Sequence, residues 1–422
     1  MNKSIKIWHI LLSFFVFISV FRFEEILNCW NYLLNLSAAV VTGTFVASAH
    51  INIEIADLLF QSVLIVAAPV LLIVFRRRFR FIFFRTNITT FFLLMLAACF
   101  VFAPLLTFES PELSKNISVT KLLQPFSEVK KIYLSIPSDN DDYLIQLKQK
   151  ISFRDIEKKI EYADSILVSK KIICFQNNSS KEYNSDEVLM SGQKPVVTSR
   201  LFLLGTDEHG RDVLVRIIYG SRISVFIGLL AVLLSFVIGV SAGFTAGYSG
   251  GFLDSVLSRI TDLFLAFPII FFVVLILALF GSSITSIIIV LGLSGWMSLF
   301  KIVKAEVISI KTKEYFQSAK MIGLKNYDLL TKEVLPVIMV PVSVNLIFLY
   351  GNVILSESAL SYLGLGITSD YPSWGKMIEA GQEYIVKAWW LFFFPGLMLV
   401  LTILTANNLG RKINLYYNPR LK

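Results

Sequence analysis

Long apolar runs alternate with polar segments along most of this chain, and many of the runs are long enough to cross a bilayer. A membrane-spanning helix needs about 20 predominantly apolar residues. From residue 91 onwards six runs are predicted as spans, at Phe91–Leu106, Ile223–Ala246, Leu263–Phe280, Ile284–Lys301, Val337–Leu355 and Trp389–Ala406. The pattern therefore predicts an all-α polytopic membrane protein with a six-helix core.

Three more apolar stretches precede this core, at residues 7–21, 27–49 and 55–75. The first follows Lys3 and Lys6, as in a signal peptide, but the small-residue site Ala47–Ala49 lies too far downstream for cleavage. We expect an uncleaved segment. Residues 1–75 then form extra N-terminal hydrophobic segments, and their number of spans stays open.

From Thr107 to Arg200 the apolar runs stop, and Lys, Asp, Glu, Asn and Ser dominate. Residues 107–200 are therefore predicted to be a soluble insertion of mixed structure, with helix-like spacing from Leu144 to Leu167. We find no catalytic constellation in it. A spacer and a rim for a soluble partner are both compatible with its sequence.

Composition and charge support a membrane protein and suggest its orientation. The chain is 55% hydrophobic, with 36 Phe, and carries a net charge of +9. The basic residues gather beside apolar runs, which is typical of cytoplasmic anchoring and disfavours nucleic-acid binding. This applies above all to Arg76, Arg77, Arg78, Arg80 and Arg85. Residues 76–106 then comprise a basic cytoplasmic segment and a first core helix that runs outward. The insertion is consequently extracytoplasmic, and residues 201–422 supply the other five core helices.

A polar island, residues 306–336, separates two of the predicted spans on the cytoplasmic side. Lys313–Met321 is predicted to form a short helix, Gly323 occupies the position of a left-handed C-terminal cap, and Asn326 can cap a second helix that ends before Pro336. A helix-turn-helix with no room for a catalytic pocket suggests a surface for a soluble partner. A solvated connecting loop is the alternative interpretation.

The island resembles the EAA loop of ATP-binding-cassette importer permeases. Gln317-Ser318-Ala319, Gly323 and Leu335-Pro336 keep its spacing, although Gln317, Ser318 and Glu333 replace Glu, Ala and Ile of the pattern. The resemblance implies docking to an ATPase through Glu314, Tyr315, Phe316, Gln317, Ser318, Ala319 and Gly323. Tyr315 and Phe316 would anchor in a partner groove, while Ala319 and Gly323 would allow close approach.

The segment Gly205–Asp212 has the glycine spacing of a phosphate-binding loop but lacks its chemistry. Arg211 and Asp212 stand where such a loop needs Lys and then Ser or Thr, so the chain is not expected to bind ATP itself. The segment instead resembles the GTDxxGRDxLSRxxYGxRxSL signature of the dipeptide, oligopeptide and nickel branch of these permeases. A structural role in a turn and an interfacial helix is expected for Gly205, Asp207, Gly210, Arg211, Asp212 and Arg222, with Arg216 and Arg222 reaching lipid headgroups.

Two features of the next span concern packing and charge. Gly239, Gly243 and Gly247 are spaced by four, which predicts close helix packing. The following residues resemble the family run GYxGGxxDxxxxRxxD...FP. For its charged members we expect internal ion pairs, with interfacial anchoring as the alternative; they are Asp254, Arg259 and Asp262.

The last two motifs lie near the C-terminus. Residues 357–366 and 372–377 resemble the family segments ExxLSFLGLG and PSWGxM, and they supply the translocation or gate candidates Glu357, Ser361 and Trp374. A carboxylate at the end of a span is a functional candidate by default, and local satisfaction of a helix-end acid is the alternative for Glu357. Arg411 and Asn418 replace aspartates in a tail that otherwise resembles NxLGDxLRDxLDPR.

The combined resemblance covers about Thr90 to Lys422 apart from the insertion. It implies a multi-pass permease subunit of a bacterial or archaeal inner or plasma membrane, which imports peptides or a related solute such as a nickel chelate by alternating access. The implied partners are a second homologous permease of open identity, two ABC ATPases that hold ATP and Mg, an extracytoplasmic solute-binding protein and membrane lipid.

No cofactor, metal or catalytic group is expected on this chain. Its histidines, His9, His50 and His209, lie in unrelated segments, and Cys29, Cys99 and Cys174 imply no disulfide framework. The alternative function is a membrane-anchored enzyme or receptor that acts through residues 107–200. Substrate identity and the purpose of the insertion stay open.

Overall fold

A computed structural model describes residues 7–41, 53–74, 87–135, 143–152, 159–168, 172–177, 179–192, 194–324, 328–367 and 371–417. The basic cluster Arg76–Arg85, the expected cap Asn326 and the tail after Tyr417 lie outside these residues. The chain divides into two compact units. Unit 1 comprises Met1–Arg222 and Tyr384–Leu391, and unit 2 comprises Ile223–Glu383 and Phe392–Lys422.

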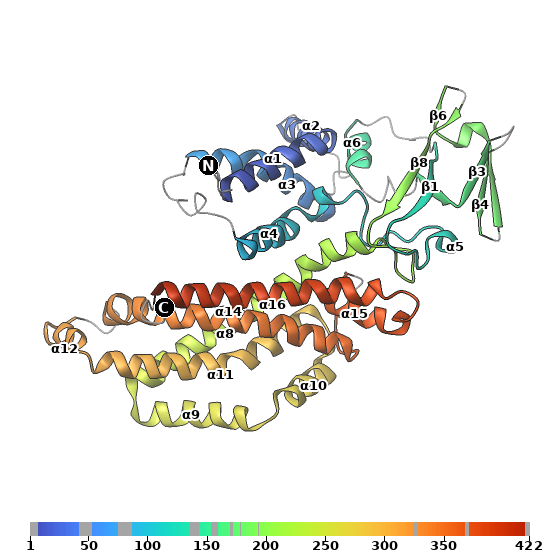
Figure 1. The fold of residues 1–422 in the computed structure, drawn as a ribbon. Helices are drawn as coiled ribbons and strands as arrows, with labels where there is room; N and C mark the ends of the chain where they lie inside the picture. Colours follow the sequence, from blue (N-terminus) through green and yellow to red (C-terminus); the bar gives the residue numbers. More distant parts are fainter. Residues whose placement is uncertain are drawn as a thin grey trace, which may run out of the picture. The chain divides into compact units, whose positions relative to one another are not determined.

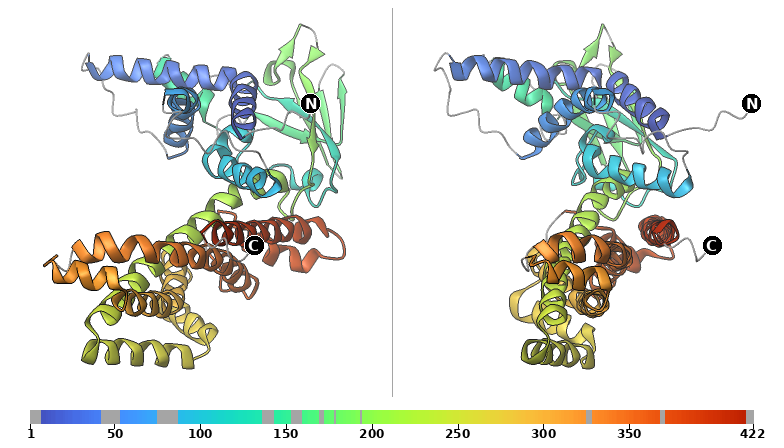
Figure 2. Two further views of the ribbon diagram at one scale, coloured as in Figure 1. Left: turned by 60° about the vertical axis from the view of Figure 1, so that its left-hand side comes forward. Right: turned by 90° about the vertical axis from the view of Figure 1, so that its left-hand side faces the viewer.

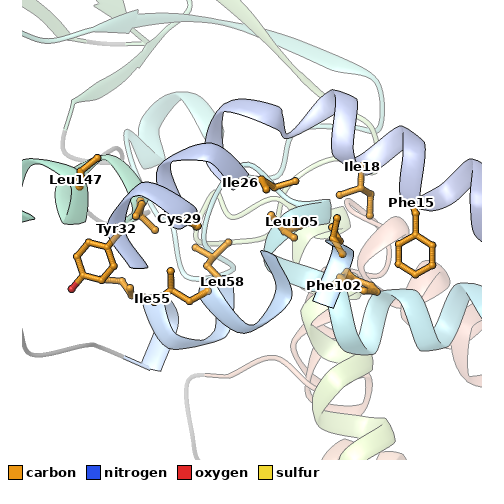
Figure 3. Close-up of a cluster of buried hydrophobic side chains, with 13 residues drawn as sticks. Phe15, Ile18, Ile26, Cys29, Tyr32, Ile55, Leu58, Phe102, Leu105 and Leu147 are labelled. Carbon is orange, nitrogen blue, oxygen red and sulfur yellow. The ribbon is translucent and has the colours of Figure 1, made fainter. Parts of the chain in front are cut away.

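The helices at the start of unit 1 pack around one apolar cluster. They are α1 (Ile7–Phe21), α2 (Phe23–Val41), α3 (Ile53–Val74) and α4 (Ile88–Leu106), and α6 (Tyr143–Ile151) of the insertion joins them. Figure 3 shows side chains from all five helices meeting, among them Ile18, Cys29, Ile55, Phe102 and Leu147. The extra N-terminal segments thus share a core with the first expected core span.

The turn between α1 and α2 also holds the end of α4. The guanidinium of Arg22 donates a 3.0 Å hydrogen bond to the carbonyl of Leu105 and a second hydrogen bond to the carbonyl of Thr107. The last carbonyls of a helix have no partner within the helix, so a buried cation there satisfies groups that would otherwise be left unpaired. Arg22 also pairs with Glu25 at 2.6 Å.

The insertion is mainly β-structure in three antiparallel groups. The first sheet has the order β2-β1-β8, with β1 at Ser127–Tyr133, β2 at Ile160–Ala163 and β8 at Val197–Phe202. The second has the order β3-β4-β5, with β3 at Ser165–Val168, β4 at Ile172–Gln176 and β5 at Ser179–Tyr183. The hairpin of β6 (Met190–Ser191) and β7 (Lys194–Pro195), the short helix α5 (Ile117–Thr120) and the 3-10 turn η2 (Ser185–Glu187) complete it. Figures 1 and 2 show the green strands beside the blue helices of the same unit.

The register explains where the helical prediction for this region was wrong. The helix-like spacing from Leu144 holds only as far as Ile151, and residues 160–168 form β2 and β3 instead. Strand β1 pairs Lys130 with Ala163 on one side and Ser127 with Phe202 on the other. These partners are distant in sequence, so the pairing overrides a local periodicity.

Unit 2 is built from long helices. They are α8 (Val213–Ser249, which begins in unit 1), α9 (Gly251–Ala266), α10 (Ile269–Phe280), α11 (Ile284–Lys311), α14 (Leu335–Tyr362) and α16 (Trp390–Tyr417). The shorter elements are α12 (Glu314–Met321), the π-helical turn η3 (Leu329–Val334), α15 (Trp374–Gly381) and the 3-10 turn η4 (Gln382–Tyr384). Figure 1 shows α12 at one end of this bundle and α15 at the other.

Within the described residues, five helices are long and apolar enough to cross a membrane: α4, α8, α11, α14 with the end of η3, and α16. The bent pair α9 and α10 makes a sixth if it counts as one span. The prediction of one continuous span at Leu263–Phe280 was wrong, because the helix breaks at Phe267–Pro268 and bends by 90°. Proline has no backbone N–H and disfavours helical geometry at the residue before it, and Phe267 is extended, with φ −94° and ψ 129°.

The predicted close packing of the glycine triad is confirmed between α8 and α11. A Cβ atom added to Gly243 would lie 2.7 Å from the carbonyl oxygen of Phe300, and one added to Gly247 would lie 2.9 Å from Cβ of Val307. On the facing helix, the carbonyl of Gly292 accepts a 2.7 Å hydrogen bond from the Ser235 hydroxyl. The two backbones therefore approach too closely for side chains at these positions.

Candidate functional site

The segment between α11 and α14 forms the predicted short helix, α12, and ends it as expected. Gly323 has φ +87°. Its N–H donates to the carbonyl of Lys320 at 3.1 Å, and the N–H of Leu324 donates to the carbonyl of Ala319 at 3.3 Å. This pair of bonds is the Schellman arrangement, which satisfies carbonyls at a helix end and requires a left-handed residue, usually glycine. The turn after α12 is therefore set by Gly323.

The side chains of α12 divide into an internal and an external set. Phe316 and Ala319 are buried in this chain's own core, where they pack with Ile310, Leu329 and Ile338. On the other side Tyr315 is 46% exposed, and the apolar side chains of Met321 and Ile322 are 85% and 82% exposed. Phe316 was expected to anchor in a partner groove, whereas its side chain holds α12 against the bundle. Glu314, Gln317 and Ser318 are exposed.

The expected stop before Pro336 was wrong. The π-helical turn Leu329–Val334 runs directly into α14, and Pro336 lies in the first turn of that helix. Proline is tolerated there because the first N–H groups of a helix have no intrahelical partner. The segment is thus a short exposed helix, a left-handed turn and a continuous entry into the next long helix.

Glu357, Ser361 and Trp374, the three gate candidates, lie together at the opposite end of α14. Glu357 is 1% exposed, and Ser361 and Trp374 are fully buried. The carboxylate of Glu357 accepts hydrogen bonds from the hydroxyls of Ser373 at 2.9 Å, Ser361 at 3.2 Å and Ser358 at 3.4 Å. These three hydroxyl donors satisfy the buried acid locally, and it forms no salt bridge with the described part of the chain.

Ser373 connects this acid to α15, a role that the sequence analysis missed. Its hydroxyl accepts the N–H of Lys376 at 3.1 Å as the N-cap of α15 while donating to Glu357. A serine just before a helical run is the sequence signal that could have revealed it. A Cβ atom on Gly375 would lie 2.8 Å from Cα of Ser358, so α15 lies directly on α14.

In the signature segment, Asp207 organises the turn before α8. Its carboxylate accepts the N–H groups of His209 and Arg211 at 2.9 Å each, and the Arg211 guanidinium donates to it at 2.7 Å. Gly205 and Gly210 have φ of +77° and +74°. Arg216 is 4% exposed and lies 3.5 Å from Asp207, so the expectation that it reaches lipid headgroups was wrong. Its charge is neutralised inside the chain.

A second charge cluster connects the insertion to the start of α8. Asp212 caps α8 by accepting the N–H of Leu214 at 2.8 Å, and it also accepts a 3.0 Å hydrogen bond from Arg200 of β8. Arg200 lies 3.6 Å from Glu109, which accepts the hydroxyl of Tyr162 at 3.0 Å. Burial raises the pKa of Asp212, and Arg200 opposes that rise. Burial by itself lowers the pKa of Arg200, but Glu109 and Asp212 raise it further than burial lowers it.

Arg222, the last arginine of the signature, was also expected to reach lipid headgroups, but it binds the extra N-terminal segments instead. Its guanidinium donates to both oxygens of Asp57 on α3, at 2.5 and 3.0 Å. A two-bond pair of this kind fixes geometry as well as charge. Asp57 is an acid inside an apolar run, which is the signal that could have identified it as a partner.

The charges on α9 are partly paired internally, as predicted. Asp254 forms an ion pair with Lys304 of α11, and Asp262 lies 3.3 Å from Lys301. Arg259 is exposed and forms no salt bridge within the described part of the chain.

One group of side chains has the composition of a metal site, formed by Asp207, Glu208 and His209. Its central acid is already occupied by two N–H groups and a guanidinium, and the His209 ring Nδ1 lies 3.1 Å from Arg211. These donors compete with a cation, so the group does not fit a metal ion. The three cysteines are free, and burial raises the pKa of Cys174 to about 11.

Comparison with known proteins places this chain beside transport components. Residues 239–422 match the family described as "Binding-protein-dependent transport system inner membrane component". The dipeptide transport system permease protein DppC of Bacillus subtilis is 39% identical over 219 residues, which are 52% of this chain and 68% of that protein. The oligopeptide transport system permease protein OppC of Salmonella typhimurium is 35% identical over 238 residues, 56% of this chain and 78% of that protein. Among solved structures, the inward-facing MetNI methionine ABC transporter has a TM-score of 0.38 and 14% identity, with 47% of this chain and 95% of that chain covered.

Proposed function

Because this chain belongs to the family of binding-protein-dependent transport system inner membrane components, we propose that it imports peptides as half of an ATP-driven translocation pathway. As a family member it is a multi-pass inner-membrane permease subunit and a non-catalytic component, whose partners are an ATPase and a binding protein. The peptide substrate is proposed from the relatives DppC and OppC. The finer assembly, with two ATPases and a second, homologous permease in a lipid bilayer, is part of the proposal.

The observation that carries the proposal is the exposed helix α12. It lies between two long apolar helices and presents Tyr315, Met321 and Ile322 outward, while Phe316 holds it to the bundle. On a polar loop outside the long apolar helices, a patch of large exposed apolar side chains marks a protein–protein or membrane interaction site. We propose that these three residues enter a groove of the ATPase and that Glu314, Gln317, Ser318 and Gly323 shape the contact, whereas Ala319 packs against this chain's own core.

The buried cluster around Glu357 is proposed to belong to the translocation machinery at the other end of α14. Its hydrogen bonds to Ser361 and Ser373 join α14 to α15 next to Trp374. If α15 moves as the pathway opens, these bonds must differ between states, which is the condition for coupling binding to movement. The signature residues Asp207, Arg211, Asp212 and Arg222 are proposed to be structural.

Co-purification tests the proposal. We would tag the chain in its host, solubilise it gently, identify the associated proteins and assay ATP hydrolysis. The variant carries Met321→Asp and Ile322→Asp, and the matched control is Val386→Asp, which changes a 93% exposed apolar residue outside α12. We expect the double variant alone to lose the ATPases and hydrolysis. Recovery of the tagged wild-type chain without partners or nucleotide-dependent activity would contradict the importer assignment.

A further inference from the structure

A cavity of about 560 Å³ is lined by residues of α11, α14 and α16. These residues belong to the end of the bundle that carries α12 (Figure 1). Towards the middle of the bundle α14 and α16 are close, because a Cβ atom on Gly410 would lie 3.2 Å from the ring of Phe348. Phe348 also lines the cavity, so the cavity begins next to this contact. Its volume is in the range of small-molecule sites.

The polar residues that line this cavity bring several hydrogen-bond acceptors. Among the described residues, Glu306 of α11 supplies the charge in the lining, and Asn345, Asn414 and Tyr417 add polar groups. Glu306 is half-buried and forms no salt bridge within the described residues. A negative, partly enclosed site with several acceptors favours a cationic ligand.

Asn345 carries the strongest indication that the cavity is a binding site. Its Oδ1 is buried and has no hydrogen-bond partner in the described structure, although the residue lines the cavity. Buried polar atoms are nearly always paired, so each orphan calls for an explanation. A cation beside Glu306 would turn the amide oxygen towards itself and satisfy it.

Pro341 adds a backbone acceptor to the same wall. Proline has no N–H to donate to the carbonyl four residues earlier in a helix, so the carbonyl of Val337 lacks its usual partner. Both residues line the cavity. Three acceptors of different kinds, a carboxylate, an amide oxygen and a backbone carbonyl, match the three N–H donors of a primary ammonium group.

We propose that this cavity binds the primary ammonium group of a small solute, with Glu306 and Asn345 as its principal ligands. The ammonium chemistry follows from the cavity alone. The choice of a short peptide as its source rests on the proposed function, and the headgroup of phosphatidylethanolamine is the second source of the same group.

The test measures binding to the full chain in phosphatidylcholine nanodiscs by calorimetry, with glycylglycine, N-acetylglycylglycine and ethanolamine as probes. We expect glycylglycine to bind and the acetylated peptide not to bind, because acetylation removes the charge and two donors. Glu306→Gln should weaken binding roughly ten- to a hundredfold, as expected for a hydrogen bond to a charged group. The control Glu383→Gln, an exposed acid at the other end of the bundle, should change nothing.

A second variant separates binding from folding. Asn345→Leu removes the orphan oxygen, so it should leave the melting temperature unchanged or raised while glycylglycine binding falls by a similar factor. Binding that survives acetylation, Glu306→Gln and Asn345→Leu would overturn the proposal, and so would failure of all the amines to bind.

Two further outcomes identify the source of the ammonium group. Ethanolamine binding without glycylglycine binding keeps the ammonium site and counts against peptide as its ligand, while the co-purification experiment judges the importer assignment separately. In nanodiscs that contain phosphatidylethanolamine, retention of that lipid by the wild-type chain but not by Glu306→Gln, measured by native mass spectrometry, assigns the site to lipid.

Discussion

Replacing Gly323 tests whether the left-handed turn after α12 controls coupling to the ATPase. Gly323 has φ +87°, and an added Cβ atom would meet nothing within 4 Å. Gly323→Ala therefore changes the backbone preference without creating a clash. An L-residue in the left-handed conformation costs about 1–2 kcal/mol, which alters a conformational equilibrium by a factor of about 5 to 30.

Three substitutions should rank by their tolerance of positive φ. Asparagine enters this region more readily than alanine, so Gly323→Asn should be milder than Gly323→Ala. Gly323→Pro should be the most severe, because proline fixes φ near −65° and removes the N–H that donates to Lys320 at 3.1 Å. We expect coupled transport and partner-dependent ATP hydrolysis to decrease least in Gly323→Asn, more in Gly323→Ala and most in Gly323→Pro.

Gly281 provides the matched control. It also has a positive φ, +79°, with open space around it, but it lies before α11 whereas α12 follows that helix. A helix of this length spans about 42 Å. Gly281→Ala should thus carry a similar conformational penalty and leave hydrolysis coupled to transport. Equal loss of coupling in the two alanine variants, or no difference between Gly323→Asn and Gly323→Ala, would refute the reasoning.

Three other changes test the packing and the buried charges. Gly243→Leu should force α8 from α11 and lower stability by about 1–3 kcal/mol or more, whereas Gly396→Leu, with nothing within 4 Å of its added Cβ, should not; thermal unfolding compares them. Arg200→Met should cost about 3–5 kcal/mol by leaving buried carboxylates unpaired, and adding Asp212→Asn should recover part of it. Burial already raises the pKa of Asp212, and the Arg200 variant lacks the cation that opposes this rise. The loss of folding stability in the Arg200 variant should therefore grow as pH rises through the Asp212 pKa, which unfolding at several pH values measures. Glu357→Gln keeps one acceptor oxygen for the Ser361 and Ser373 hydroxyls, so it should fold normally, whereas Glu357→Leu should lose about 1–3 kcal/mol because these hydroxyls lose their acceptor; equal melting temperatures would contradict this.

Local signals in the sequence predicted the features that depend on local chemistry. The long apolar runs predicted the spans, and the spacing around Lys313–Met321 with Gly323 predicted α12 and its left-handed end. The glycine spacing of four predicted the close contact of α8 with α11. In each case the cause acts over a few residues or along one helix face.

Features that depend on partners distant in the chain could not be predicted from the sequence. No local pattern could show that Arg222 meets Asp57, or that Arg200 lies between Glu109 and Asp212, because these residues come together only when separate segments pack. The strands of the insertion could not be predicted for the same reason, since they pair with partners many residues away. The break at Pro268 had a local signal, but an apolar run that continued on both sides of the proline concealed it.

Because β1 pairs with β8, the first and last strands of the insertion lie side by side. Ser127 faces Phe202 and Ile132 faces Val197, so the chain leaves and returns on two strands about 4.8 Å apart. The length of the chain between β1 and β8 does not change the distance between these two paired strands. Residues can therefore be inserted or deleted there without altering the length that the membrane helices must span. A shortened chain could join Ile132 to Val197 through a tight Asn-Gly turn and would retain Lys131 on β1 and Arg200 on β8. A different outer domain could be grafted at the same junction.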